Sequence, residues 1–279
     1  ESEELYDRCI MSHTTFISYR EFENVLGLHG IDDYPTKNKK TGGYSGGSYD
    51  TDPYILLNYQ DKYNDMSTLI HEMGHSMHSY YSRSYNEFQN SEYRIFVAEV
   101  ASTVNELLLS HYMLENSGSK EEKLFILNNL MELYKATIYR QTMFAEFERD
   151  ISKIIDNDGA LTSEKLSNMY YDLNKFYFGD NVYVDNEIRY EWERIPHFYY
   201  DFYVYKYATG LSAATKIVDN ILNKKENAVS NYIEFLKCGS KLSPLESLKV
   251  AGVDLADDEV VTLALKTFGN YVDMYKKEM

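Results

Sequence analysis

Apolar residues recur at helical spacing along most of the chain, and this pattern predicts a mainly helical protein. An N-terminal helix is expected on Leu5, Cys9, Phe16 and neighbouring apolar residues, followed by a polar loop over residues 31–40. Residues 178–194 lack a clear period and are expected to be extended or looped. Further helices are expected over residues 63–83, 93–115, 119–156, 163–176, 197–223, 227–237 and 257–277, with another starting at Ser243.

Residues 41–59 interrupt the helical pattern and predict a small β hairpin or edge sheet. Residues 41–49 contain four glycines, which allow another backbone to approach closely, but they lack the Gly-Lys-Ser/Thr ending of a phosphate loop. Residues 54–59 are the strongest strand candidate. Because no internal repeat or long linker occurs, we expect residues 1–279 to form one mainly helical domain.

The acidic balance of the chain changes which partners are expected. The formal net charge is -16 over 279 residues, and such a surface repels phosphate backbones and anionic lipids, so we expect neither nucleic acid nor membrane partners. No apolar stretch is long enough for a transmembrane helix, and the acidic N-terminus does not resemble a signal peptide. Two cysteines, Cys9 and Cys238, are too few for a disulfide framework, which favours a cytoplasmic protein.

The strongest chemical signal is the sequence His71-Glu72-Met73-Gly74-His75. Two imidazoles four residues apart lie on one face of a helix, so both can point at a single ion. Glu72 lies beside them and could reach a water bound to that ion, as in the His-Glu-x-x-His zinc peptidases. The alternative is a pair of solvent-facing histidines on an ordinary helix.

Zinc in a peptidase needs three protein ligands and one open position, so a further ligand must come from elsewhere. Glu99 lies in an apolar run with Val97 and Val100, where a carboxylate is costly unless a cation pairs with it. Glu106 lies seven residues later on nearly the same face and could accept a hydrogen bond from a metal-bound histidine. Either glutamate could instead face solvent on an ordinary helix.

Three parts of the chain carry a specific resemblance. Residues 43–45 and 49–58 read Gly-Tyr-Ser and Tyr-Asp-Thr-Asp-Pro-Tyr-Ile-Leu-Leu-Asn. Residues 71–81 read His-Glu-Met-Gly-His-Ser-Met-His-Ser-Tyr-Tyr, and residues 96–106 read Phe-Val-Ala-Glu-Val-Ala-Ser-Thr-Val-Asn-Glu. Residues 194–210 read Arg-Ile-Pro-His-Phe-Tyr-Tyr-Asp-Phe-Tyr-Val-Tyr-Lys-Tyr-Ala-Thr-Gly. Together these motifs resemble the catalytic portion of the oligoendopeptidase F family, within the thimet oligopeptidase-like zinc metallopeptidases.

The resemblance implies a mainly α, zincin-type catalytic domain with a small sheet near residues 41–59. It implies one Zn2+ ion held by His71, His75 and Glu99, with Glu72 as the general base. The expected reaction is hydrolysis of internal peptide bonds in short oligopeptides, and the strand expected over residues 54–59 could pair with the substrate backbone.

The resemblance also assigns roles outside the metal centre. It implies three catalytic side chains that hydrogen-bond substrate and the developing oxyanion: His197, Tyr200 and Tyr207. It implies three substrate-binding residues: Gly43, Tyr44 and Tyr203. On the helix expected over 197–223, Tyr200, Tyr203 and Tyr207 share one face, which is also the pattern of an aromatic packing stripe.

Members of this family are usually longer, and their additional N-terminal helices form the second wall of a deep channel that restricts them to short peptides. The resemblance therefore implies a missing N-terminal domain or a partner chain. Residues 1–40 would be a remnant of that missing domain. Two other functions stay open. One is a metallocarboxypeptidase, and the other is a non-catalytic zinc-binding or assembly module derived from a truncated peptidase.

Overall fold

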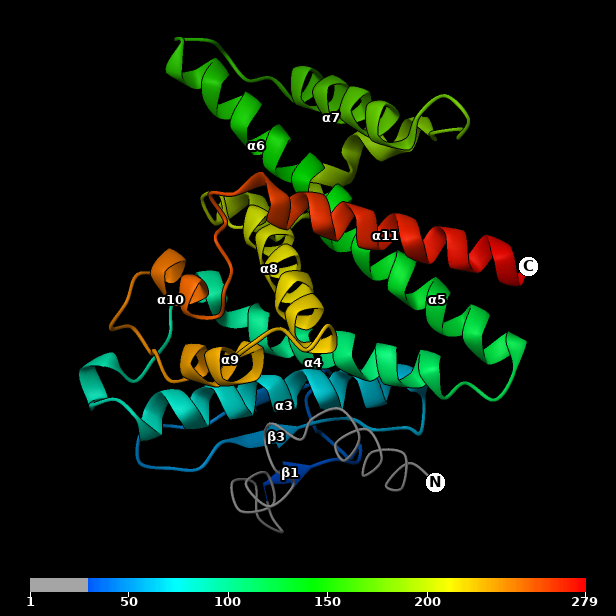
Figure 1. The fold of residues 1–279 in the computed structure, drawn as a ribbon. Helices are drawn as coiled ribbons and strands as arrows, with labels where there is room; N and C mark the ends of the chain where they lie inside the picture. Colours follow the sequence, from blue (N-terminus) through cyan, green and yellow to red (C-terminus); the bar gives the residue numbers. More distant parts are fainter. Residues whose placement is uncertain (1–29) are drawn as a thin grey trace. The chain divides into compact units, whose positions relative to one another are not determined.

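Helices dominate the computed structural model, which describes residues 30–279 (Figure 1). The described residues form two compact units: the first comprises residues 30–131 and 210–279, and the second comprises residues 132–209. The predicted fold class, mainly α with a small sheet, is confirmed. The N-terminal helix predicted around Leu5 and Cys9 lies outside the described residues, and the single-domain organisation stays a prediction.

The first unit contains the sheet and most of the long helices. Its strands are β1 (Ile31–Asp32), β2 (Tyr44–Gly46) and β3 (Tyr54–Leu56). The helices wholly inside it are α3 (Tyr63–Ser84), η2 (Phe88–Asn90), α4 (Ile95–Glu115), α9 (Ala228–Leu236), α10 (Pro244–Val250) and α11 (Asp258–Glu278). Two helices belong to it in part, α5 (Lys120–Tyr134) and α8 (Tyr205–Leu222). Most of these bounds agree closely with the periodicity of the sequence.

The second unit is built on two long helices. Its elements are the π-helix η3 (Lys135–Tyr139), α6 (Arg140–Asp156), α7 (Ser163–Phe178), and the 3-10 helices η4 (Asn186–Arg194) and η5 (Pro196–Tyr199). Its core is apolar and aromatic, and consists of Met143, Phe144, Phe147, Tyr170, Ile195 and Val204. The helix predicted without interruption over 119–156 therefore contains a π turn, where the hydrogen-bond register widens by one residue.

The sheet has the strand order β1-β3-β2. β2 runs antiparallel to β3, which confirms the predicted hairpin, and β1 adds a parallel strand on the other side. The loop predicted over residues 31–40 thus begins with a strand. Because β3 is paired on both sides, the prediction that this strand pairs with a substrate backbone is wrong: its backbone donors and acceptors are already used.

Two predicted segments between residues 178 and 223 differ from the structure. The stretch expected to be extended or looped ends in η4. The helix expected over 197–223 is broken, because η5 ends at Tyr199 and α8 begins at Tyr205. Between them, Asp201 and Phe202 have φ angles of 48° and 54°, in the left-handed region that no α-helix can include. The tyrosines of this segment are spaced close to the helical period, which led to the prediction of a continuous helix.

Helix α3 starts at a carboxylate cap and packs along α4. The Asp65 carboxylate accepts the backbone N–H groups of Gln60 and Lys62, at 2.8 and 3.1 Å, which satisfies donors at the helix start. The face of α3 toward the core is apolar and consists of Met66, Ile70, Met73, Met77 and Tyr81. Figure 1 shows α3 and α4 lying side by side, with β3 and β1 on the other side of α3.

The two helices approach each other tightly at Gly74. A Cβ atom built on Gly74 would lie 2.5 Å from Ser102 Cα and 2.7 Å from the Ala101 carbonyl oxygen, both backbone atoms of α4. Only glycine fits this contact without separating the helices. The glycine between Glu72 and His75 is therefore a packing requirement of the two helices that carry the predicted metal ligands.

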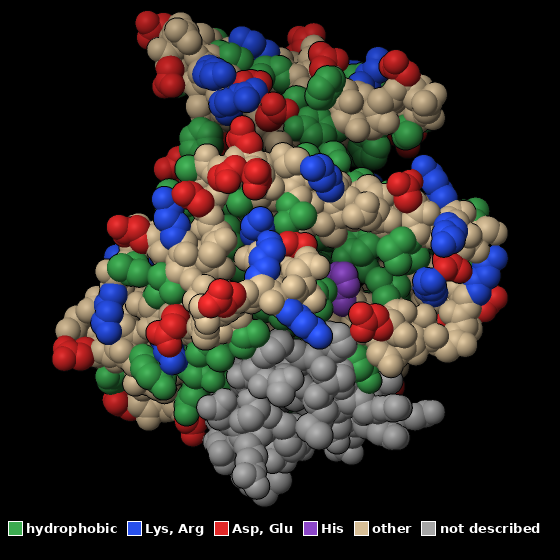
Figure 2. Space-filling view, viewed as in Figure 1, with side chains coloured by type: hydrophobic (Ala, Val, Ile, Leu, Met, Phe, Trp, Pro, Cys, Tyr) green, Lys and Arg blue, Asp and Glu red, His purple; other side chains and the backbone are tan. Residues whose placement is uncertain are grey.

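The charges of the described surface are mixed in sign. Figure 2 shows acidic and basic side chains interspersed over the visible face, without a broad area of one sign. Among the described helices, none combines the length and apolar character that crossing a bilayer requires.

Gly74→Ala tests the helix contact. The added methyl group meets rigid backbone, so we expect the free energy of unfolding to fall by about 1–3 kcal/mol, measured by urea denaturation. Gly269→Ala on α11 is the matched control, because a Cβ at Gly269 meets no atom within 4 Å. There the substitution should leave stability unchanged or raise it by up to about 1 kcal/mol. Equal stability of both variants would contradict the contact.

Candidate metal centre

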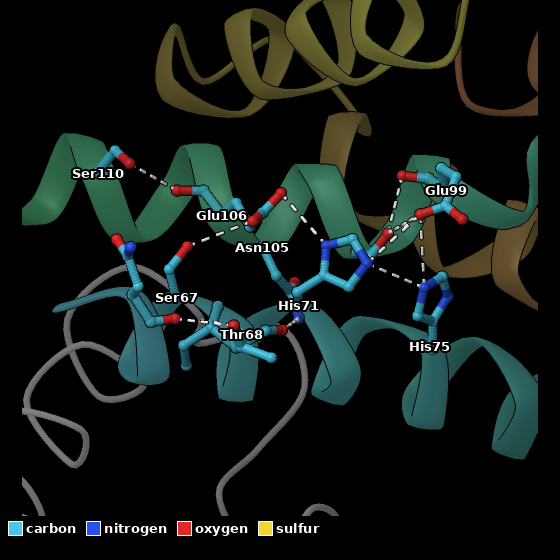
Figure 3. A network of polar contacts seen from close by, with 11 residues as sticks. Ser67, Thr68, His71, His75, Glu99, Asn105, Glu106 and Ser110 are labelled. Carbon is cyan, nitrogen blue, oxygen red and sulfur yellow. Dashed lines mark hydrogen bonds and ion pairs between the residues drawn. The ribbon is translucent and has the colours of Figure 1, made fainter. Parts of the chain in front are cut away.

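The two histidines of the central motif point toward one another from successive turns of α3 (Figure 3). The Nε2 atoms of His71 and His75 lie 3.1 Å apart, and the ring planes are inclined at 80°. Both side chains are partly exposed, at 26% and 18%. The spacing of four residues produces this geometry locally, since i and i+4 positions are neighbours on a helix surface.

Helix α4 supplies the third donor. Glu99 Oε2 lies 3.4 Å from His71 Nε2 and 3.5 Å from His75 Nε2. Ser102 Oγ donates to the Glu99 backbone carbonyl at 2.9 Å and lies 3.3 Å from Oε2, which orients the carboxylate from its own helix. On α8, Gly210 faces Glu99: a Cβ there would lie 4.0 Å from Glu99 Cβ. The structure thus brings together the three residues predicted as metal ligands.

The three donor atoms have the spacing that a tetrahedral ion requires. Ligand bonds of about 2.0–2.2 Å in tetrahedral geometry separate the donor atoms by about 3.3–3.6 Å. The separations among His71, His75 and Glu99 are 3.1, 3.4 and 3.5 Å, close to one triangular face of such a tetrahedron. All three ligands offer atoms that zinc prefers, two imidazole nitrogens and a carboxylate oxygen. The donor set therefore fits a zinc ion with one position left for substrate or water.

The electrostatics of this cluster favour a positive charge at its centre. Burial opposes protonation of His71, but its hydrogen bonds to Glu106 and Glu99 together outweigh burial and raise the pKa of His71 to about 10. Hydrogen bonds from His71, and then from His75, hold the pKa of the Glu99 carboxyl well below its usual range. Two carboxylates close to an imidazole pair stabilise a cation, whether that cation is a proton or a metal ion.

Glu106 lies behind His71, on the side away from Glu99 (Figure 3). Its Oε2 is 3.3 Å from His71 Nδ1, and its Oε1 accepts a hydrogen bond from Ser67 Oγ at 3.2 Å. With Nδ1 engaged in this way, Nε2 of His71 is left to face the metal position, and the ring orientation is held. The structure therefore places Glu106 where it can orient the ligand, rather than in solvent.

Glu72 and His78 are buried on the same helix. The Glu72 side chain is 8% exposed, and its role as a base stays a prediction. His78 stacks on Tyr93 with ring centroids 3.6 Å apart and an interplanar angle of 3°. Burial, and then the charge of His75, lower the pKa of His78 to about 3, so this imidazole is neutral. It belongs to the packing of α3 and not to the donor cluster.

The predicted substrate residues near β2 have visible packing roles. A Cβ on Gly43 would lie 2.9 Å from Thr68 Cγ2 and 3.1 Å from Leu57 Cδ2, so glycine allows the sheet to approach α3. Tyr44 is 42% exposed, and its ring meets that of Tyr54 edge to face, with centroids 5.9 Å apart. Substrate binding by Gly43 and Tyr44 stays a prediction.

In the second unit, His197, Tyr200, Tyr203 and Tyr207 form a group of touching rings, here called the aromatic cluster. His197 stacks on Tyr203 with centroids 5.5 Å apart, and it meets Tyr200 and Tyr207 edge to face at 6.1 Å each. The sequence pattern predicted three of these tyrosines on one helical face. The structure groups them instead through the turn at Asp201 and Phe202. Their part in catalysis stays a prediction.

Comparison with known proteins adds an independent finding. A sequence profile described as "Peptidase family M3" matches residues 16–267. "Oligopeptidase PepF" of Bacillus subtilis is 50% identical over 257 residues, which cover 91% of this chain and 38% of that protein. "Group B oligopeptidase PepB" of Streptococcus agalactiae is 42% identical over 274 residues, covering 92% of this chain and 45% of that protein. The chain thus spans less than half the length of these curated relatives.

Solved structures resemble the fold as well. The crystal structure of oligoendopeptidase-F from Enterococcus faecium superposes with a TM-score of 0.70 at 40% identity, and the match covers 77% of this chain and 39% of that one. A structure of PZ peptidase A with an inhibitor has a TM-score of 0.72 at 17% identity, covering all of this chain and 49% of that one; it shows a shared fold alone.

Glu106→Ala tests the contact behind His71. Without the carboxylate the imidazole loses its orienting partner, so we expect zinc affinity to fall by about 10–100-fold, measured by competition with a chromogenic chelator. Glu115→Ala, at the exposed end of the same helix, is the control and should bind zinc as the unchanged chain does. Equal affinity of the Glu106 and Glu115 variants would contradict the assignment.

Proposed function

The chain belongs to peptidase family M3, and on that basis we propose that it carries the zinc-dependent catalytic centre of an oligopeptidase. The proposed reaction is hydrolysis of internal bonds in short peptides. The single observation that carries the proposal is the triangle of His71, His75 and Glu99 donor atoms. Their spacing suits a tetrahedral ion, and the curated relatives named as oligopeptidases support the substrate class.

Zinc held by these three residues would supply a Lewis acid that polarises a peptide carbonyl and acidifies water. Glu72 precedes Met73 on the same helix and adjoins His71, so we assign it the proton transfers. Its carboxylate would take a proton from the attacking water and deliver it to the leaving amine. Glu106 would keep the His71 ring in the orientation that the reaction needs.

The aromatic cluster is the proposed source of hydrogen bonds to the reacting peptide. His197, Tyr200 and Tyr207 carry donors that could stabilise the negative charge on the carbonyl oxygen as the tetrahedral species forms. Tyr203 stacks on His197 and would contact substrate beside it. Such donors act most strongly when they are held in place before the reaction begins.

Substrate backbone would pair with β2 rather than β3. Among the described strands, β2 lies at one edge of the sheet, whereas β3 is enclosed. β2 is also tied to the metal-site helix, because Ser45 Oγ and Ser76 Oγ are hydrogen bonded at 2.8 Å. Pairing through backbone groups would give a broad tolerance of side chains.

We keep the cytoplasm as the proposed location.

Glu72→Gln tests the proposed function. The amide cannot accept a proton, so cleavage of an internally quenched peptide should fall by at least ~10²-fold, while zinc content stays at one ion per chain. Zinc is measured by mass spectrometry of the metal, and a chelator should abolish cleavage by the unchanged chain. Turnover by Glu72→Gln at the unchanged rate would refute the assignment of the base.

The same peptides separate this proposal from the two other functions. An endopeptidase cleaves peptides blocked at both ends, whereas a carboxypeptidase requires a free carboxylate. A binding or assembly module would hold zinc and cleave neither form. Cleavage of the doubly blocked peptide, with fragments identified by mass, is the expected result.

A further inference from the structure

A strained turn lies inside the segment that carries the aromatic cluster. Asp201 and Phe202 are consecutive residues with φ angles of 48° and 54°, a conformation that is costly for any residue with a Cβ atom. Burial of the Phe202 ring does not explain the turn, because that side chain is 39% exposed. Neighbouring structure must therefore hold the backbone in this shape.

The two ends of the segment are anchored in the core, but the turn is not. Ile195 and Val204 are 6% and 1% exposed and belong to the apolar core of the second unit. Residues 199–202 between them are exposed. Apolar packing thus fixes where the segment leaves and re-enters the core, and leaves the turn itself to be set by polar contacts.

Glu148 of α6 makes such a contact. Its side chain is buried, at 4% exposure, and Oε1 accepts the backbone N–H of Phe202 at 3.2 Å. Among the described residues, Oε2 is buried without a hydrogen-bond partner, and Glu148 has no ion pair. Burial raises the pKa of Glu148, while the Phe202 N–H favours its ionised form. A buried carboxylate is expensive, so its placement against the strained turn calls for a reason.

The turn determines how the rings meet. Tyr200 and Tyr203 flank Asp201 and Phe202, and their ring centroids are 6.1 Å apart. Both also contact His197. If Asp201 and Phe202 relaxed to the ordinary right-handed or extended regions, the chain direction between the two tyrosines would change and these contacts would be lost.

We propose that Glu148 is a positioning residue that holds the turn at Asp201 and Phe202 and thereby places the aromatic cluster for its work on substrate. The contact with the backbone N–H compensates the strain, and the rings follow from the turn. The catalytic consequence rests on the proposed function. A donor displaced by about 1 Å can cost about 10²-fold in rate, so the effect should appear in kcat more than in KM.

The test compares variants of the full chain by amide hydrogen exchange and by peptide cleavage. In Glu148→Ala, exchange over residues 200–204 should rise at least ~10-fold, and kcat should fall about 10–100-fold with KM within about twofold. Glu148→Gln keeps a carbonyl oxygen as acceptor and should stay close to the unchanged chain. Glu146→Ala is the matched control, because this neighbour on α6 accepts from Tyr177 on α7 and not from the turn.

Rescue gives the sharpest comparison. Glycine adopts positive φ without strain, so Asp201→Gly in the Glu148→Ala background should recover part of the lost kcat. If Glu148 served only the stability of the fold, Asp201→Gly would not restore kcat. If Glu148→Ala fails to fold, Glu148→Met fills a similar volume without a strong acceptor and replaces it in each comparison.

The outcomes separate this inference from the proposed function. Unchanged exchange over residues 200–204 in Glu148→Ala would overturn the role of Glu148 at the turn. Raised exchange with unchanged kcat would overturn its role in placing the cluster. If the unchanged chain loaded with zinc cleaves no peptide, the proposed function fails, and hydrogen exchange still decides whether Glu148 holds the turn.

Discussion

The close contact between α3 and α4 at Gly74 is the constraint on which the candidate metal centre depends. A single helix can present two imidazoles to one ion, but the third donor must come from another element. The Glu99 carboxylate lies within 3.5 Å of both Nε2 atoms, next to the contact at which the backbones of the two helices nearly touch. The glycine that permits this contact lies within the motif itself, one residue before His75.

The charges around this contact explain why the cluster is stable as a group. Glu99 and Glu106 lie on opposite sides of His71, and each offers a carboxylate oxygen to a different ring nitrogen. Either carboxylate alone would be costly in a partly buried position. Together with the imidazoles they form a site whose negative charge a bound cation would balance, which is the electrostatic condition for binding a metal ion.

The sequence predicted the elements that depend on local spacing and missed those set by tertiary contacts. The bounds of α3, α4 and α11 follow from helical periodicity, and so they were predictable. The structure of residues 197–204 was not predictable, because evenly spaced tyrosines are compatible both with a helix and with a turn whose rings cluster. Glu148 carries no sequence signal of its own: its significance comes from Phe202, which lies far along the chain.

By itself, the sequence determined which residues could bind an ion and that His71 and His75 share a helical face, because both facts follow from residue type and the period of an α-helix. It also offered Glu99 and Glu106 as candidates. Only the tertiary structure decided that Glu99 completes the donor triangle, that Glu106 stands behind His71, and that the rings of residues 197–207 meet through a turn rather than along a helix. Such contacts depend on how closely packed backbones approach, which spacing along the chain does not encode.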